Sequence, residues 1–160
     1  MGFWAISQNK SGLTGQVDTS FTNYKALQWA LKTNPQAKLA KAQTSRSIKI
    51  QRGIVYKQIG ARKLLMDEFS PIHPTGQTIL FIHGGGWRSG NRTQHEPLAQ
   101  TLAARGYHVF LVEYRLSTEA LYPAAMMDVK SALDWLHGHA KEKHLNPKKI
   151  AVAGDRKSVV

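Results

Sequence analysis

Three consecutive glycines between a histidine and a tryptophan, His83 to Trp87, are the part of the sequence with the clearest chemical use. They directly follow the apolar stretch 78–82, which predicts a strand. Three glycines in a row are costly in chain entropy, so the loop must need a backbone geometry that only glycine allows. Without Cβ atoms, such a loop can turn its N–H groups towards a substrate oxygen. Donors of this kind stabilise the negative charge that forms during acyl transfer.

Two other uses of a glycine loop fit this stretch less well. Phosphate-binding loops carry a G-x-G-x-x-G or G-K-[ST] spacing, which residues 84–90, GGGWRSG, lack. A simple tight turn does not require His83 before the glycines and Trp87 after them. An oxyanion hole for acyl transfer is therefore the favoured interpretation.

The elements that must position this loop follow an alternating pattern. Period-two hydrophobicity over residues 47–69 predicts an antiparallel hairpin, with Leu65 and Met66 as the residues expected to face the core. After it, apolar strands alternate with amphipathic helices, which predicts a parallel sheet with right-handed crossovers. The fold class is therefore α/β, with the hairpin leading into the parallel sheet. The expected strands are 78–83, 107–114 and 149–153, and the expected helices are 94–105 and 123–142.

Three elements have a distinct apolar pattern. A short amphipathic helix is expected over residues 21–32, before Asn34-Pro35. The helix over 123–142 is expected to bury the apolar residues Met126, Val129, Leu133 and Leu136. The apolar run 150–153 is typical of a fully buried strand.

The composition excludes several classes of protein. The 160 residues include no cysteine, which excludes disulfides, thiolate metal sites and a cysteine nucleophile. No apolar run approaches the roughly 18–20 residues of a membrane span. The net charge is +12, and residues 1–63 hold 11 Lys and Arg against one acid, Asp18. The lysines are scattered and no stacking-aromatic pattern accompanies them, so we expect a solvated basic face and no nucleic-acid partner.

The first residues leave two interpretations open. Residues 3–6 are apolar, and the tripeptide that ends at Ser7 has the small-x-small pattern of a signal-peptidase site. Either Met1 is an internal methionine of a longer signal peptide and the protein is exported, or the apolar residues pack on the domain and the protein is cytoplasmic. Residues 1–46 are thus interpreted as a leader that includes the short amphipathic helix.

Four motifs together resemble one known family: HGGGWRSGN (83–91), VEYRLS (112–117), YPAAMMDVKSALDWL (122–136) and NPKKIAVAGD (146–155). They are similar to the carboxylesterase branch of the α/β-hydrolase superfamily. The most similar members are the feruloyl and acetyl-xylan esterases, within the hormone-sensitive-lipase-like branch. The resemblance covers residues 47–155 in order. It implies the N-terminal half of an α/β-hydrolase fold, with 47–155 an incomplete domain.

The resemblance assigns roles to residues of the glycine loop. The backbone N–H groups of Gly85 and Gly86 would be the oxyanion donors. His83, Gly84 and Trp87 would brace the loop and border the substrate pocket. The resemblance implies no metal and no organic cofactor.

The last residues depart from the family pattern. In this family the final strand leads into a nucleophile elbow, Gly-Asp-Ser-Ala-Gly-Gly, whose serine attacks the ester. Gly154 and Asp155 match this pattern, but Arg156 stands where the serine is expected. We interpret residues 156–160 as a non-native tail, because a common short-read sequencing adapter encodes this string in one frame. The alternatives are a natural inactive homologue and a nucleophile shifted to Ser158, which lacks the flanking glycines of the elbow. The family's catalytic acid and histidine follow the elbow, so we expect the 160-residue chain to be inactive.

The activity implied for the parent protein is that of a serine carboxylesterase. Its substrate would be a small-molecule or polysaccharide ester, with acyl esters on plant polysaccharide as the first expectation. Formamidase-like amide hydrolysis and lipid ester hydrolysis are alternatives on the same fold. A non-catalytic binding protein on this scaffold is the alternative from another class.

Two further groups of polar residues have simple structural explanations. His137, His139 and His144 could be metal ligands, but residues two apart on a helix point to different faces, so a surface cluster is expected. Asp128 lies one turn into its helix, where the dipole favours a carboxylate. Arg115 is its candidate partner and would support the loop above the pocket. Ion pairing and helix-end electrostatics both remain open for Asp128.

Overall fold

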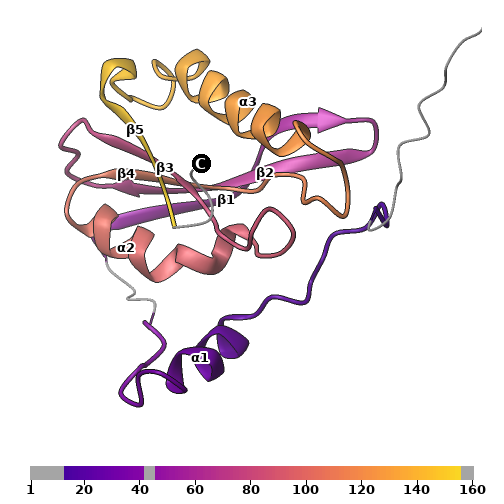
Figure 1. Cartoon of the computed structure of the whole chain (residues 1–160). Coiled ribbons are helices and arrows are strands. Elements are labelled where there is room, and N and C mark those ends of the chain that lie inside the picture. Colours follow the sequence, from indigo (N-terminus) through magenta and orange to yellow (C-terminus); the bar gives the residue numbers. More distant parts are fainter. Residues whose placement is uncertain (1–12, 42–45, 156–160) are drawn as a thin grey trace, which may run out of the picture.

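The computed structural model describes residues 13–41 and 46–155. A five-stranded sheet with the order β1-β2-β4-β3-β5 forms its centre, and α2 and α3 cover opposite faces of that sheet (Figure 1). The strands are β1 (Ile48–Ile59), β2 (Arg62–Pro71), β3 (Thr78–Ile82), β4 (His108–Val112) and β5 (Ile150–Gly154). The helices are α1 (Asn23–Leu31), α2 (Glu96–Ala104) and α3 (Ala124–Gly138), with 3₁₀ turns η1 (Arg92–His95) and η2 (Pro147–Lys149).

The sheet is mixed, as predicted from an antiparallel hairpin that leads into a parallel sheet. β1 pairs with β2, and β2 with β4, in antiparallel fashion, whereas β3 is parallel to both β4 and β5. In register, Ile82 of β3 lies beside Val112 of β4 and Gly154 of β5. The carboxyl ends of these three strands therefore meet at one edge of the sheet. Open α/β sheets bind their ligands at this edge.

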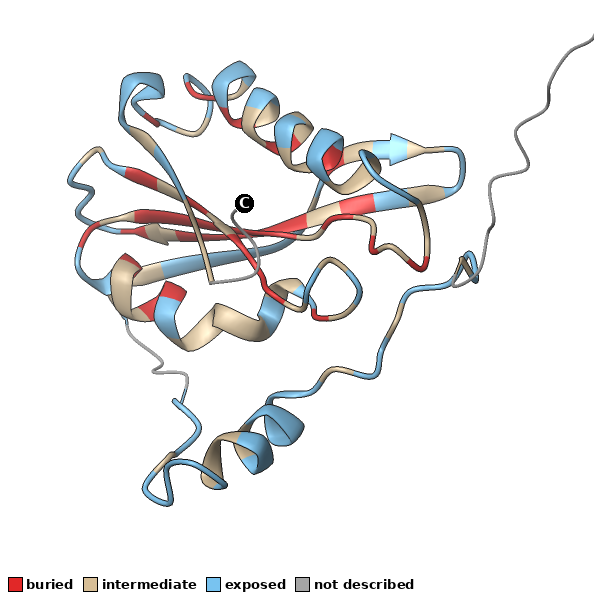
Figure 2. Ribbon diagram, in the orientation of Figure 1, coloured by how far each residue is buried: buried red, intermediate tan, exposed pale blue. Residues whose placement is uncertain are grey.

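The two faces of the sheet have separate apolar cores, which appear as buried segments on the strands and on the inner sides of α2 and α3 (Figure 2). Leu64 and Met66 of β2 are buried in the cluster that packs against α3. Phe69 lies on the other face, in the cluster that packs against α2. The prediction that Leu65 faces the core is wrong, because strand side chains alternate and Leu64 and Met66 occupy that face. Leu65 is only partly buried.

Helix α3 differs from its prediction in length and in face. It ends at Gly138, four residues before the expected end at 142. Its buried residues are Asp128, Ala132 and Leu136. Met126 was expected on this face but is 47% exposed. At about 100° per residue, Met126 lies roughly a third of a turn away from the centre of the stripe that residues 128, 132 and 136 form.

Strand β5 is not the fully buried strand that its composition predicted. It lies at the edge of the sheet, and its one strand partner within the described ranges is β3. Val152 is consequently 47% exposed. An apolar strand is buried only when both neighbours and both faces are covered, and composition alone does not show whether they are.

The described N-terminal segment lies outside the sheet. Helix α1 has no buried residue, as its exposed and intermediate colours show (Figure 2). The N–H groups of Thr14 and Gly15 donate to the carbonyl of Thr118, 2.9 and 2.8 Å away, which holds the segment to the loop after β4. No helix in the two described ranges is both long and apolar enough to cross a membrane. The interpretation of Met1 to Ser7 as part of a signal peptide falls outside these ranges.

Candidate active site

The glycine loop, residues 83–91, begins at the carboxyl end of β3. The chain after β4 supplies Tyr114 and Arg115 beside it, and β5 ends at Gly154 in the same register. The glycine loop, the segment after β4 and the end of β5 thus lie at one edge of the sheet, and each belongs to one of the sequence motifs.

His83 is a buried, neutral support of this loop. Its side chain is almost inaccessible, and its ring stacks on Tyr114 with the centroids 4.3 Å apart. The Tyr114 hydroxyl donates to the His83 carbonyl over 2.7 Å. Nδ1 of His83 lies 3.0 Å from the Gly84 carbonyl, which can only accept, so Nδ1 carries the proton. Burial lowers the pKa of His83 to about 4, which leaves the ring uncharged at neutral pH.

Each of the three glycines is required for a different reason. A Cβ atom on Gly84 would lie 1.9 Å from the Asp155 carboxylate, so Gly84 makes room for that side chain. Gly85 has a φ of +131°, and a Cβ atom there would lie 2.0 Å from the Ser89 carbonyl oxygen. Gly86 has a φ of +64°, and a Cβ atom there would meet nothing within 4 Å. Of the three, Gly86 alone borders open space.

The turn after Gly85 is closed by backbone hydrogen bonds. The N–H groups of Arg88 and Ser89 donate to the Gly85 carbonyl at 3.3 and 3.2 Å. The Trp87 carbonyl accepts from the N–H of Ser117 at 2.7 Å. Within residues 13–41 and 46–155, the N–H groups of Gly85 and Gly86 donate to no acceptor. These are the two N–H groups that the resemblance named as oxyanion donors.

Trp87 connects the loop to the core and to a cavity. Its ring lies 5.2 Å from the Tyr114 ring, centroid to centroid, and packs against the α3-side cluster. The same side chain lines a cavity of about 530 Å³ whose other wall comes from residues 117–127. Trp87 therefore borders a pocket of the described structure.

Arg92 holds the far end of the loop, and nothing in the sequence pattern indicated this role. Its Nε lies 3.0 Å from the Asp67 carboxylate, and its NH1 lies 2.6 Å from the Glu113 carboxylate. Asp67 on β2 is 1% exposed and also pairs with Arg52. These four charged residues are far apart in sequence, so only the register of the sheet brings them together.

Arg115 and Asp128 form the ion pair that was one of the two interpretations. The Arg115 guanidinium reaches the Asp128 carboxylate through Nε at 2.7 Å and NH2 at 2.9 Å. Lys57 of β1 adds a second cation, whose Nζ lies 2.8 Å from the Asp128 carboxylate. Burial alone would raise the pKa of Asp128, but the hydrogen bonds from Arg115 and Lys57 outweigh it and lower the pKa. The pair joins α3 to the segment that follows β4.

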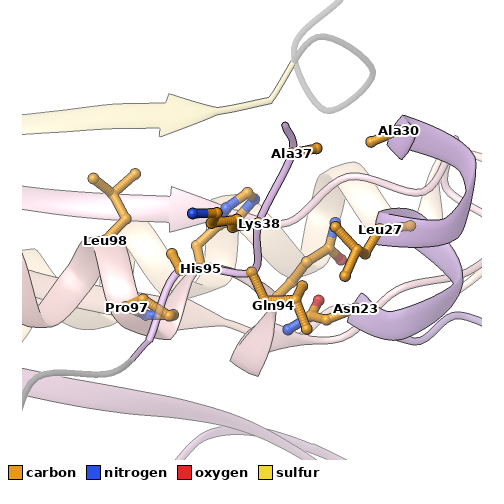
Figure 3. Close-up of a pocket in the computed structure, with 12 residues that line it drawn as sticks. Asn23, Leu27, Ala30, Ala37, Lys38, Gln94, His95, Pro97 and Leu98 are labelled. Atoms are coloured by element: carbon orange, nitrogen blue, oxygen red, sulfur yellow. The ribbon is translucent and has the colours of Figure 1, made fainter. Parts of the chain in front are cut away.

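A second cavity, of about 340 Å³, lies between α1 and α2 (Figure 3). Leu27 and Ala30 of α1 line it from one side, and Gln94 and His95 line it from the other. None of the site residues expected from the sequence lines this cavity. His95 nevertheless lies near the glycine loop, because its Nε2 is 3.4 Å from the carboxylate of Asp155, and that carboxylate lies against Gly84.

His137, His139 and His144 lie at the end of α3 and in the segment that follows it. No group of three His, Cys, Asp or Glu side chains that could hold a metal ion occurs within the described part of the chain. His139 stacks on Trp135, with ring centroids 3.9 Å apart. His137 and His144 are exposed, as the surface cluster expected from helix geometry requires.

Comparison with known proteins decides the family. The family model named BD-FAE matches residues 66–156, which is more than half of the chain. The chain belongs to the BD-FAE family. The BD-FAE match includes the glycine loop, the Arg115–Asp128 pair and β5. The predicted resemblance to α/β-hydrolase esterases is thereby confirmed.

Relatives of this BD-FAE chain include two kinds of curated esterase. It is 40% identical to Carboxylesterase NlhH of Mycobacterium tuberculosis over 78 residues, which are 48% of this chain and 24% of that protein. It is 39% identical to an acetyl esterase of Salmonella schwarzengrund over 89 residues, which are 54% of this chain and 27% of that protein. The chain thus spans about a quarter of the length of these relatives.

Solved esterase structures share the fold. A bacterial heroin esterase superposes with a TM-score of 0.64 at 28% identity, over 82% of this chain and 40% of that one. A thermophilic esterase from Thermogutta terrifontis gives a TM-score of 0.61 at 27% identity, over 71% of this chain and 41% of that one. The α/β-hydrolase fold class is confirmed. Arg156, at the position expected for the nucleophile, lies outside the described residues, as does the whole tail 156–160.

Proposed function

We propose that the protein is a carboxylic ester hydrolase in which the glycine loop binds the carbonyl oxygen of the ester. The N–H groups of Gly85 and Gly86 donate to this oxygen as it becomes negative in the transition state. One observation carries the proposal: neither N–H has an acceptor within the described part of the chain, and Gly86 borders open space. Donors that are held in place and free of partners need no rearrangement before the oxygen arrives.

His83, Gly84 and Trp87 support this loop and do not react. The uncharged His83 ring and its Tyr114 partner hold the start of the loop, and the bond from Ser117 holds the Trp87 carbonyl. Arg115 and Asp128 fix the chain segment on the other side of the pocket. Rigid support matters because an oxyanion donor acts only when it lies within hydrogen-bond distance of the developing charge.

The chemistry we propose for the parent protein is that of a serine hydrolase. A serine attacks the carbonyl carbon, a histidine takes the serine proton, and water then releases the acyl group. In the family pattern the serine stands at position 156, which is Arg156 in this chain. An arginine cannot act as this nucleophile, so we propose that the 160-residue chain binds esters without hydrolysing them.

Acyl esters on plant polysaccharide are the substrate class we propose. The motifs around residues 83–91 are most similar to those of feruloyl and acetyl-xylan esterases. The relatives named carboxylesterase and acetyl esterase support ester over amide substrates.

The decisive experiment transfers the loop into a relative that has its own nucleophile. Residues 78–118 replace the equivalent segment of the Salmonella acetyl esterase, and hydrolysis of 4-nitrophenyl acetate is measured. We expect the chimera to be active. Gly86→Ala in the chimera should lower kcat by about 10²-fold or more, because the new methyl group occupies the space that the carbonyl oxygen needs.

A matched control is Gly76, introduced with a slightly longer segment that begins at residue 74. Gly76 has a φ of +79°, close to that of Gly86, and a Cβ atom there also meets nothing within 4 Å. Gly76→Ala therefore causes the same kind of backbone strain at the opposite edge of the sheet, and kcat should change less than twofold. Equal losses at Gly76 and Gly86 would overturn the proposal. The unmodified 160-residue chain should release no nitrophenol with saturation kinetics.

A further inference from the structure

The cavity beside Trp87 is lined almost entirely by apolar groups. Its volume is about 530 Å³, within the range of roughly 300–1,000 Å³ that is usual for small-molecule sites. Trp87 forms one wall, and residues 117, 120, 122–123 and 125–127 form the other, with Tyr122, Met126 and Met127 among their side chains. None of the described residues that line the cavity is charged. This lining favours a ligand group that is uncharged and largely apolar.

This cavity begins next to the proposed oxyanion donors. Trp87 directly follows Gly86, and consecutive Cα atoms are about 3.8 Å apart. The Trp87 carbonyl accepts from the N–H of Ser117 at 2.7 Å, and Ser117 lines the cavity as well. The loop and the far wall are thus joined by a backbone hydrogen bond. A molecule whose carbonyl oxygen lies at Gly86 would have the cavity within reach of its next few atoms.

The far wall exposes large apolar side chains. Tyr122 is 88% exposed, Met126 47% and Met127 51%. Isolated exposed apolar residues are common, but a contiguous group around a concave site is typical of ligand binding. Methionine side chains are flexible and polarisable, so they adapt to ligands of varied shape.

We propose that this cavity binds an apolar substituent of the ester, and that Tyr122, Met126 and Met127 set the preference for its size. The inference rests on the proposed function, because the ester carbonyl must lie at Gly85 and Gly86. A water molecule takes about 30 Å³ in the liquid, so an acetyl group would leave most of the cavity filled with water. Each additional buried methylene should strengthen binding by about three- to fourfold. The site therefore favours esters with substituents larger than acetyl.

Two methyl ketones test this inference on the 160-residue chain without any hydrolysis. 2-Butanone and 2-octanone share a carbonyl group and differ by four methylenes. NMR titrations follow the amide signals of Gly85 and Gly86 together with the methyl signals of Met126 and Met127. We expect 2-octanone to bind at least tenfold more tightly. The amide signals should respond to both ketones, and the methionine signals mainly to 2-octanone.

Met126→Glu and Leu121→Glu form the matched pair of variants. Both side chains are exposed, at 47% and 41%, but only Met126 lines the cavity. We expect Met126→Glu to reduce the advantage of 2-octanone over 2-butanone to about twofold or less, and Leu121→Glu to keep it. Equal affinities of the unmodified chain for the two ketones, or equal losses in the two variants, would overturn the inference. A third outcome separates the two proposals. If 2-octanone bound more tightly and shifted the methionine signals while the amide signals of Gly85 and Gly86 did not respond, the apolar site would be supported and the proposed oxyanion function refuted.

Discussion

The buried carboxylate of Asp128 accepts three hydrogen bonds from Arg115, two from the guanidinium and one from the backbone N–H. Asp128 is on α3 and Arg115 lies just after β4, so the pair connects a helix to the edge of the sheet where the glycine loop lies. Asp128 is 0% exposed and Arg115 is about one-fifth exposed. A planar guanidinium that meets a carboxylate with two bonds also fixes the relative orientation of the two groups.

Replacing Asp128 by asparagine should destabilise the chain by about 3 kcal/mol, because removing one partner of a buried ion pair leaves the other charge without compensation. The measurement is the free energy of unfolding from urea titration at pH 7. Asp134→Asn on the same helix is the control. Its partner Lys130 and Asp134 itself are both about 60% exposed, so that change should cost less than 0.5 kcal/mol. Similar costs for the two variants would show that the Arg115–Asp128 pair does not anchor α3.

The sequence indicated the Arg115–Asp128 pair but not the contacts of Arg92. Asp128 could be found because a carboxylate within an apolar helix face needs a partner, and a basic residue lies in the preceding loop. Arg92 is paired with Asp67 on β2 and Glu113 after β4. These contacts depend on which strands are neighbours and in what register, and a single sequence does not encode that order locally.

The fold class was predictable, whereas the faces of individual elements were not. Alternating strands and helices led directly to the parallel sheet that β3, β4 and β5 form. Leu65 was misplaced because Leu64, Leu65 and Met66 are all apolar, so period two does not select a face. β1 adds to the difficulty, since register shifts between Gln51 and Ile54 and between Val55 and Lys57 interrupt its alternation.

The three glycines of the loop should differ in their tolerance of alanine. Gly85→Ala should cost about 2–3 kcal/mol, because its φ of +131° is accessible essentially to glycine alone and the new methyl group meets the Ser89 backbone. Gly86→Ala should cost only about 1–2 kcal/mol, since a φ of +64° is a left-handed conformation and the space is open. Urea unfolding of the two variants measures the difference.

A control for this series lies in α3. Gly138 is helical and exposed, and an added Cβ atom there meets nothing within 4 Å. Gly138→Ala should therefore stabilise the chain by up to about 1 kcal/mol, through the better helix propensity of alanine. If Gly85→Ala were as well tolerated as Gly86→Ala, the turn in which Arg88 and Ser89 donate to the Gly85 carbonyl would be absent in solution.

Acid should weaken the fold through His83. Burial lowers the pKa of His83 to about 4 in the folded chain, whereas an unfolded histidine has a pKa near 6.5. Above pH 6.5 the ring is neutral in both states, and the full stability is present. Between pH 6.5 and 4 the unfolded chain binds a proton that the folded chain does not. The free energy of unfolding therefore decreases as the pH is lowered through this range, by roughly 3 kcal/mol in total.

His83→Gln should remove this part of the pH dependence, whatever it does to the stability at pH 7.5. The measurement compares urea midpoints of the parent chain and the variant at pH 7.5, 6 and 5. His73→Gln removes an exposed histidine and serves as the control. Its urea midpoint should change with pH as that of the parent chain does. If the urea midpoints of the parent chain and His83→Gln changed equally with pH, the His83 ring would not be buried beneath the loop.

The edge strand β5 should promote self-association of the chain. Within the described ranges β5 pairs with β3 on one side, so the other side presents backbone N–H and C=O groups that can pair with a second copy. A lysine on an edge strand opposes such pairing, because two copies would bring like charges together. Val152→Lys should therefore reduce the aggregated fraction, measured by light scattering during concentration.

Ile72 provides a control that separates edge pairing from general hydrophobic contact. Val152 and Ile72 are almost equally exposed, at 47% and 48%, but Ile72 lies just after β2 and outside β5. If backbone pairing at β5 drives association, Val152→Lys reduces scattering several-fold, and Ile72→Lys leaves it close to that of the parent chain. Equal reductions would indicate association through exposed apolar side chains in general, and β5 would then have no special part in it.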